Sequence, residues 1–462
     1  MERTTAKKNK YEIDMCNGTI MDKLISFSLP LMLSGILQLM FNAVDIIVVG
    51  RFSGSQALAA VGSTSALINV FTNLFIGISL GANVLTARFY AAGREKEVSE
   101  TVHTAITLAL VSGIVMALVG LVFSRGALAL MGTPDDVIGL SALYMRIYFL
   151  GMPFFMLYNY GAAILRAVGD TKRPLLFLMI AGVINACLNM VLVIVFKLGV
   201  AGVAIATVIS QMISCVLVLR CLCQSKTSYR LRFSELGMKG YYLKQIFSVG
   251  VPAGIQSTVI NFSNVLLQSS VNSFGSTAMA GYTAANNLLG FLYVSVNSIT
   301  QACMSFTSQN YGVGKLKRMD RVLADCMILS VVVAVVLGCI CYGFGPEILQ
   351  IYTEDAEVIA CGMEILAYTT ITYFLCGWMD LFPGALRGMG YSAVPMVLSV
   401  IGTVGTRVVW IFGIFPYHRS LAILFISYPA SWIITIILQV VCFYFVRRRV
   451  HRRSQTLAGQ EG

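Results

Sequence analysis

A single carboxylate stands inside the first long apolar stretch of the chain. Asp45 belongs to residues 41–50, which close an apolar stretch that begins near Leu24. An ionised carboxylate inside hydrocarbon costs about 3 kcal/mol on insertion scales, so membrane segments rarely carry one without a use. A carboxylate at such a depth can bind and release a proton or a hard cation, and we predict this role for Asp45. The alternative is a residue near the outer interface, paired with Arg51 or Arg146.

Four neutral polar side chains in later apolar stretches suit the chemistry of this carboxylate. Asn185 and Asn189 are four residues apart, so they share one face of a helix. Asn159 and Thr207 lie in the apolar stretches before and after that helix. Carboxylate, amide and hydroxyl oxygens are ligands of a hard cation such as sodium, and a carboxylate alone accepts a proton. The alternative is that these groups form hydrogen bonds between helices.

A further set of polar side chains is predicted to line a substrate cavity. Gln38 and Asn42 lie in the same apolar stretch as Asp45. The others are in the second half of the chain, namely Gln256, Asn261, Asn264, Gln268, Asn286, Tyr293 and Asn297. Neutral polar residues in membrane helices also serve as hydrogen-bonding contacts between helices, so this second interpretation stays open for each of them.

Four more charged residues fall within apolar stretches. Glu364 and Arg407 would lie roughly 10 Å below the outer surface if each residue of a helix rises 1.5 Å. They can therefore form an ion pair, or they can serve substrate binding or gating. Asp380 lies nearer the cytoplasmic end of its stretch, and Arg146 lies in the fourth stretch.

The composition shows that the elements carrying these residues are membrane helices. Hydrophobic residues make up 57% of the 462 residues and charged residues 12%, against about 25% charged residues in soluble proteins. We predict an all-α membrane protein whose twelve transmembrane helices cover 24–50, 60–87, 102–124, 138–164, 174–196, 199–221, 245–270, 279–306, 322–344, 358–385, 394–415 and 421–446.

The distribution of basic residues predicts the orientation. About 27 of the 33 Lys and Arg residues fall in the tails and the even-numbered connections, which the positive-inside rule places in the cytoplasm. Both termini are then cytoplasmic. The net charge of +12 is thus a topology signal, and we expect no nucleic-acid partner.

An internal repeat divides the chain into two halves. Residues 165–169 (Leu-Arg-Ala-Val-Gly) recur as residues 386–390 (Leu-Arg-Gly-Met-Gly), about 221 residues later. Each half holds six spans, which predicts two six-helix bundles related by a pseudo-two-fold axis along the membrane normal. Pro30 and Pro252 stand early in the first span of each half and are candidate hinges. The predicted parts are a cytoplasmic tail 1–23, a lobe 24–224, a cytoplasmic linker 225–244, a lobe 245–446 and a basic cytoplasmic tail 447–462.

Motifs of enzyme chemistry do not account for the chain. Residues 77–81 match the GxSxG nucleophile pattern but lie inside a predicted membrane helix, so we interpret them as a small-xxx-small packing motif. The sequence holds no Walker A motif, no HExxH motif and no calcium-binding loop. We therefore expect a protein that is not an enzyme and that draws energy from an ion gradient.

The chain resembles the multidrug and toxic compound extrusion (MATE) family. The resemblance rests on residues 44–51 with 57–60, on residues 165–172 and on their copy at 386–390, and it covers nearly the whole chain. It implies an exporter that exchanges cationic or amphipathic organic compounds for protons or sodium ions. The branch resembling DinF fits better than the branch resembling NorM, because residues 259–262 lack the acid that the latter uses in the seventh span.

In the DinF-like branch the coupling site lies in the N-terminal half. The resemblance places its aspartate at Asp45, its asparagines at Asn159 and Asn185, and its threonine at Thr207. The second acid of that site falls on Asn189, which is not an acid. A single carboxylate favours a proton slightly over a sodium ion.

The sequence thus predicts a secondary active multidrug exporter in the cytoplasmic membrane of a prokaryote. We expect a monomer in the lipid bilayer, a small organic substrate, and no cofactor other than a bound proton or sodium ion. The alternative within the same superfamily is a flippase for lipid-linked oligosaccharides, which Arg146 and Arg407 keep open. A membrane-embedded enzyme or receptor fits the duplication less well.

Overall fold

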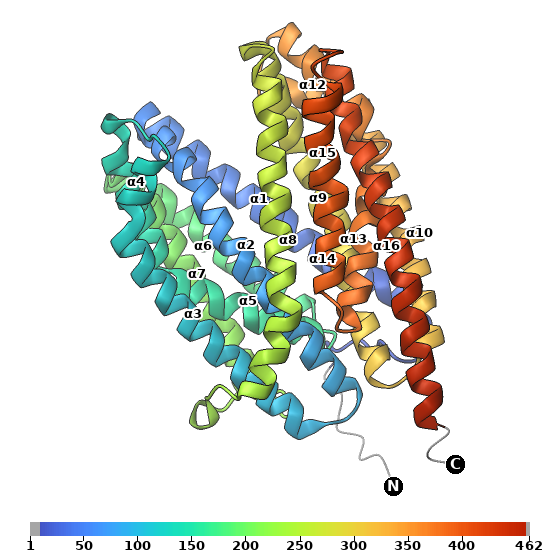
Figure 1. The fold of residues 1–462 in the computed structure, drawn as a ribbon. Helices are drawn as coiled ribbons and strands as arrows, with labels where there is room; N and C mark the ends of the chain where they lie inside the picture. The colour runs from blue at the N-terminus through green and yellow to red at the C-terminus, as the bar shows by residue number, and fades with distance from the viewer. Residues whose placement is uncertain (1–9, 459–462) are drawn as a thin grey trace. The chain divides into compact units, whose positions relative to one another are not determined.

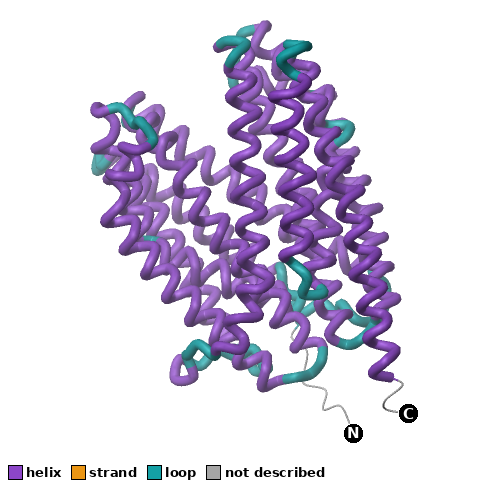
Figure 2. Tube along the Cα trace, in the orientation of Figure 1, coloured by secondary structure: helices purple, strands orange, loops and turns teal. Residues whose placement is uncertain are grey.

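The computed structural model describes residues 10–458, and this part of the chain is helical without strands (Figures 1 and 2). The helices of the first half are α1 (Met21–Phe52), α2 (Ser55–Ala91), α3 (Glu95–Leu130), α4 (Asp135–Leu150), α5 (Met152–Ala167), α6 (Lys172–Asn189), η1 (Met190–Val195) and α7 (Gly199–Cys223). After η2 (Phe233–Glu235) follow α8 (Gly240–Asn272), α9 (Ser276–Gly312), α10 (Leu316–Gly343), α11 (Gly345–Gln350), α12 (Ala356–Thr369), α13 (Tyr373–Gly388), α14 (Ala393–Ser399), η3 (Val400–Gly405), α15 (Thr406–Val409), η4 (Trp410–Ile414) and α16 (Leu421–Ala458).

Each of the twelve predicted spans coincides with one helix or with a run of consecutive helices. In the described chain, eight helices are long and apolar enough to cross a membrane, and ten spans result if each of two bent pairs is one span. The two remaining predicted spans are α8 and α9, which have 33 and 37 residues. They are long enough to cross a bilayer, but their many Asn, Gln, Ser and Thr residues lower the hydropathy.

The helix boundaries confirm the internal repeat. Helices α2 and α9 begin and end at positions that are about 221 residues apart, and so do α5 and α13. The turns before the second helix of each half also match, because Gly54 and Gly275 have φ angles of 87° and 100°. Only glycine adopts such angles at little cost, so the duplicated glycines preserve the same turn.

The fourth span is bent in both halves. Helices α4 and α5 meet at an angle of 47°, and α12 and α13 meet at 51°. A π-helix also recurs, since η1 follows α6 directly and η4 occupies the matching part of the eleventh span. π-Helical turns are rare and often mark functional sites.

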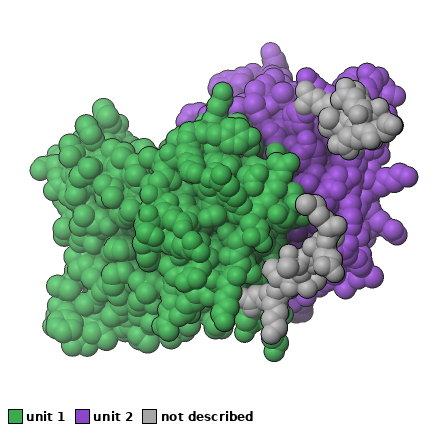
Figure 3. Space-filling view, turned by 90° about the horizontal axis from the view of Figure 1, so that it is seen from below, with its two compact units in different colours: residues 1–13, 33–251 green, residues 14–32, 252–462 purple. Residues whose placement is uncertain are grey.

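The chain forms two compact units, shown in green and purple in Figure 3. Unit 1 comprises residues 1–13 and 33–251, and unit 2 comprises residues 14–32 and 252–462. The predicted lobes 24–224 and 245–446 differ from these units at the first helix of each half. The change of unit falls at residues 32/33 in α1 and 251/252 in α8, next to Pro30 and Pro252.

Within unit 1, residues 77–81 of α2 pack against the start of α8. A Cβ atom on Gly250 would lie 2.7 Å from the carbonyl oxygen of Ile78, and one on Gly81 would lie 3.1 Å from the amide nitrogen of Gly250. Small residues such as Gly81 and Gly250 allow two helix backbones to approach this closely. The interpretation of this GxSxG match as a helix-packing motif is therefore confirmed.

Candidate functional site

Two helices of unit 1, α6 and α7, bring polar groups to the Asp45 carboxylate of α1. Asp45 lies on the last turns of α1, and Asn189, the last residue of α6, donates a hydrogen bond from Nδ2 to Asp45 Oδ1. Thr207 on α7 lies with its hydroxyl oxygen 3.4 Å from Asp45 Oδ2. The alternative partners Arg51 and Arg146 form no ion pair with Asp45 among the described residues, and both have exposed side chains.

The hydrogen bonds continue from Asn189 along α6 to α7. Asn189 Nδ2 also donates to Asn185 Oδ1 at 3.2 Å, and Asn185 Nδ2 lies 3.5 Å from the hydroxyl of Ser210. The side chain of Asn189 is fully buried, yet its Oδ1 accepts no hydrogen bond within the described chain. A buried amide oxygen without a donor is costly, so this oxygen is an available acceptor beside the carboxylate.

Asn159, the fourth predicted member, is not hydrogen-bonded into this cluster. Its Nδ2 donates to the Phe155 carbonyl one turn earlier on α5, at 2.8 Å. The side chain is half-buried. The structure therefore joins Asp45, Asn185, Asn189 and Thr207, and it leaves Asn159 on a neighbouring helix.

Two tyrosines near Asp45 were not predicted from the sequence. Tyr144 and Tyr148 of α4 are stacked with ring centroids 6.2 Å apart, and both lie within electrostatic range of the carboxylate. Tyr148 also lies near Gln211, which follows Thr207 by one turn of α7. The sequence contained one signal for this arrangement: Tyr144 and Tyr148, like Thr207 and Gln211, are four residues apart and therefore share one face of their helix.

The hydroxyl of Thr207 can serve either protonation state of the Asp45 carboxylate. The Thr207 hydroxyl has one hydrogen and two acceptors, the Val203 carbonyl at 3.0 Å and Asp45 Oδ2 at 3.4 Å. Hydroxyl bonds to an ionised carboxylate are typically 2.5–2.7 Å long. When the hydrogen points to Val203, the Thr207 oxygen can accept a proton carried by Oδ2.

The same oxygens also suit a sodium ion. The unpaired Asn189 Oδ1, the Asp45 carboxylate and the Thr207 hydroxyl are hard oxygen donors. They supply one negative charge. The donor set therefore fits a single monovalent ion or a proton.

In unit 2, the predicted ion pair between Glu364 and Arg407 is wrong. Arg407 is 3% exposed, and its Nη1 donates to Asn264 Oδ1 at 2.7 Å and to the Ser263 hydroxyl at 3.3 Å. No ion pair joins it to Glu364 among the described residues. Equal depth in the membrane did not ensure contact, because the guanidinium turns toward α8 and not toward α12.

The other charges of unit 2 have different partners. Asp380 of α13 interacts electrostatically with Arg387, whose Nη2 donates to Gln256 Oε1 at 2.6 Å. Asn297 accepts a hydrogen bond from Gln301 at 3.1 Å. These contacts place Gln256, Asn264 and Asn297 in hydrogen bonds between or within helices.

The remaining predicted cavity residues have side chains at the surface of their unit or partly buried. Exposed side chains are Gln38, Asn42, Asn261 and Tyr293, and half-buried ones are Gln268 and Asn286. Exposed polar groups on helices α1, α8 and α9 are compatible with a cavity lining, and that role stays a prediction.

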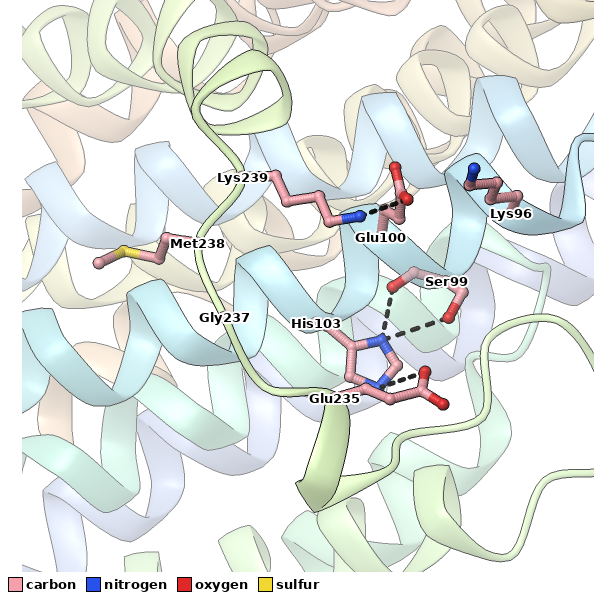
Figure 4. A pocket seen from close by; sticks show the side chains of 8 residues that line it. All are labelled: Lys96, Ser99, Glu100, His103, Glu235, Gly237, Met238 and Lys239. Carbon is pink, nitrogen blue, oxygen red and sulfur yellow. Dashed lines mark hydrogen bonds and ion pairs between the residues drawn. The ribbon is translucent and has the colours of Figure 1, made fainter.

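A polar pocket of about 440 Å³ lies between α3 and the linker that precedes α8 (Figure 4). Its lining residues are Lys96, Ser99, Glu100, His103, Glu235, Gly237, Met238 and Lys239. Lys239 is ion-paired with Glu100, and a hydrogen bond from the Arg232 guanidinium lowers the pKa of the exposed Glu235 carboxyl. These contacts fasten the linker to α3.

His103 is the buried part of this attachment. Its Nδ1 donates to the Ser99 carbonyl at 2.7 Å, and its Nε2 accepts the Arg232 backbone N–H at 3.1 Å. Glu235 lies 3.9 Å from Nε2. The neutral imidazole thus holds the linker backbone to the helix, and the pocket is explained by this structural contact.

We expect the His103→Leu variant to expose the linker to trypsin, because the Arg232 N–H loses its buried acceptor. Losing such a bond costs about 1 kcal/mol, which corresponds to roughly fivefold faster cleavage in the linker. Cleavage rates of the purified protein on denaturing gels provide the measurement. His418→Leu, at an exposed histidine, is the control. Equal cleavage rates of the wild type and His103→Leu would contradict the assignment.

Most of the chain matches known proteins. The model of the MatE family matches residues 30–191 and 252–412. The probable multidrug resistance protein YoeA of Bacillus subtilis is 31% identical over 434 residues, which are 92% of this chain and 93% of that protein. The multidrug export protein MepA of Staphylococcus aureus is 22% identical over 382 residues, or 82% and 84% of the two chains.

The fold also matches a solved structure. The outward-facing conformation of a multidrug resistance MATE family transporter of the MOP superfamily superimposes with a TM-score of 0.87. The match covers 97% of this chain and 100% of that chain at 19% sequence identity. At this level of identity the similarity concerns the fold.

Proposed function

Because the chain belongs to the MATE family and is a multi-pass membrane transporter for multidrug efflux, we propose that Asp45 couples this efflux to the entry of protons. The observation that carries the proposal is the contact of Asp45 with Asn189 and Thr207. It joins three helices of unit 1 through one titratable group. A change in the protonation of this group can therefore change how the three helices pack.

The proposed cycle follows from the hydrogen bonds. The ionised carboxylate accepts from Asn189 and Thr207 and holds α1 against α6 and α7. Protonation removes the negative charge and weakens these charge-assisted bonds. The last turns of α1 can then repack and release the exported compound. Loss of the proton to the cytoplasm restores the first arrangement.

Helix α1 contains the element that could bend in this cycle. It is a continuous helix from Met21 to Phe52, with Pro30 in its interior. Proline removes one backbone hydrogen bond and weakens the helix locally. The change from unit 2 to unit 1 follows at residues 32/33. We propose that α1 bends near Pro30 and α8 near Pro252 during transport.

The proposal extends to features that the resemblance and the charge pattern imply. Asp45, Asn185 and Thr207 are hydrogen-bonded in one cluster, which supports a coupling site like that of the DinF-like branch. The protein would act in a prokaryotic cytoplasmic membrane with both termini in the cytoplasm, since most basic residues lie on that side. It would act as a monomer, without enzymatic activity and without nucleic acid.

The test uses the wild-type protein in liposomes loaded with a fluorescent organic cation. Proton and sodium gradients are imposed separately, each with the other ion at equilibrium. We expect efflux with an inward proton gradient and none with a sodium gradient alone. Efflux driven only by sodium would reject the proton assignment. Transport of lipid-linked oligosaccharide without cation efflux would reject the exporter and favour a flippase.

The Asn189→Asp variant should change the ion. It would place a second carboxylate next to Asp45 and give the site two negative charges and an additional hard oxygen ligand, which a sodium ion can bridge. We expect sodium-driven efflux to appear and proton-driven efflux to fall by about tenfold. The same assay with separate gradients measures both. Asn159→Asp is the control, because Asn159 lies outside the hydrogen-bonded cluster. Unchanged ion preference in Asn189→Asp would contradict the assigned geometry.

A further inference from the structure

Unit 2 contains a buried positive charge, Arg407, that forms no ion pair with an acidic residue of the described chain. Arg407 is 3% exposed, and the titratable groups near its guanidinium include Tyr428, Cys376, Tyr282 and Tyr373. All of these are neutral groups. The acid Asp380 interacts with Arg387 instead. Charged residues inside membrane segments are rare and mark pathways for substrates or ions, so a buried guanidinium of this kind requires a function.

The neighbours of Arg407 leave one edge of the guanidinium without acceptors. Nη1 donates to Asn264 and Ser263, and the carbon atom of the guanidinium lies 4.8 Å from the ring centre of Tyr428. Nε is buried and has no acceptor within the described chain, and both hydrogen bonds of the guanidinium there come from Nη1, none from Nη2. The Nε–Nη2 edge is one of the two-donor forks that bind a carboxylate through parallel hydrogen bonds.

The position of Arg407 corresponds to the Asp45 cluster in the internal repeat. Tyr428 on α16 stands about 221 residues after Thr207 on α7. The contact of α1 with α6 in unit 1 corresponds to the contact of α8 with α15 in unit 2. The first contact carries a negative charge and the second a positive charge. The backbone around Arg407 also contains two π-helices, η3 and η4.

We propose that Arg407, with Asn264 and Tyr428, binds the carboxylate group of an exported amphipathic compound. This inference rests on the proposed export function. Asn264 and Ser263 hold the Nη1 side of the guanidinium, and the Tyr428 ring fixes its plane. The free Nε–Nη2 edge recognises the two oxygens of the carboxylate.

The test compares two dyes that differ in one group, a rhodamine with a free benzoate and its ethyl ester. Binding to the purified full-length protein in neutral detergent is measured by fluorescence anisotropy. We expect Arg407→Gln to weaken binding of the free benzoate by roughly 30-fold and binding of the ester by less than about twofold. Arg419→Gln, which removes an exposed arginine, should change neither. Equal weakening for both dyes, or none, would overturn the proposal.

Two further arms keep the test decisive. If Arg407→Gln does not fold, Arg407→Lys retains the charge but not the fork, and we expect about tenfold weaker binding of the benzoate only. The wild type alone must also bind the benzoate more tightly than the ester, and equal affinities would overturn the proposal.

The source of the anion is tested in lipid nanodiscs. The preference for the benzoate should be the same in neutral lipid and in lipid containing an anionic phospholipid. Loss of the preference in the anionic lipid would assign the site to a lipid phosphate and overturn the proposal. Binding requires no gradient, so a wild type that binds both dyes but exports neither counts against the export function and leaves the Arg407 site standing.

Discussion

Replacing Asp45 by asparagine is expected to reduce proton-driven efflux by at least about tenfold, to the level of liposomes without protein. Asparagine has nearly the same shape as the protonated aspartic acid but cannot ionise. The Asp45→Asn protein would stay in the repacked arrangement, because the charge-assisted bonds from Asn189 and Thr207 cannot return. Efflux of a fluorescent cation under an imposed proton gradient measures the effect.

Substrate binding separates this loss of coupling from a loss of folding. The Asp45→Asn protein should bind the organic cation in detergent and elute as a single species in size-exclusion chromatography. Asp22→Asn makes the same chemical change at an exposed position on the first turn of the same helix, and it should transport like the wild type. Efflux by Asp45→Asn at the wild-type rate would reject Asp45 as the coupling residue.

Alanine at Gly250 is expected to destabilise unit 1 strongly. Its methyl carbon would lie 2.5 Å from the Cα atom of Ile78 and 2.7 Å from the Ile78 carbonyl oxygen. Backbone atoms cannot move aside as a flexible side chain can, so α2 and α8 must separate. Overpacking of this kind costs about 1–3 kcal/mol, and we expect the apparent melting midpoint to fall by roughly 5 °C.

The matched control for this variant lies on the same helix. A Cβ atom on Gly240 meets no atom within 4 Å, so Gly240→Ala should leave the melting midpoint unchanged. Thermal unfolding followed by fluorescence-detected size-exclusion chromatography measures both variants at one heating rate. A Gly250→Ala protein as stable as Gly240→Ala would show that the two helices do not pack through these glycines.

The helical framework could be predicted from the sequence because membrane helices must satisfy their backbone internally and need long apolar stretches. Even α8 and α9 were predicted from the length of their apolar stretches, although their hydropathy is low. The composition of the two units was not predicted. Hydropathy marks where a helix begins and ends, and it contains no information on which neighbours the first turns of α1 and α8 contact.

The Asp45 cluster was predictable in part for a similar reason. A four-residue spacing placed Asn185 and Asn189 on one face, and the structure bonds Asn189 to Asp45 and Asn185 to Asn189. Asn159 was chosen by resemblance and by its span, but these fix its depth and not its direction. The same limit explains the wrong pair of Glu364 with Arg407 in unit 2. The pattern of polar residues along a sequence predicts how deep a residue lies in the membrane. A contact also depends on the direction in which its side chain points around the helix axis, which this pattern does not determine.

The division of the chain into two units affects how the protein is made. Residues 14–32 are synthesised early, but they belong to unit 2, whose other residues begin at 252. Unit 1 likewise needs residues up to 251, which follow the linker. Unit 2 therefore cannot be completed until the last helices leave the ribosome. The start of α1 is therefore made before the other residues of unit 2, which are translated more than 200 residues later. In each half of the duplicated chain, the beginning of the first helix belongs to the unit formed mainly by the other half. Two separately expressed halves would therefore form both units only if they associated.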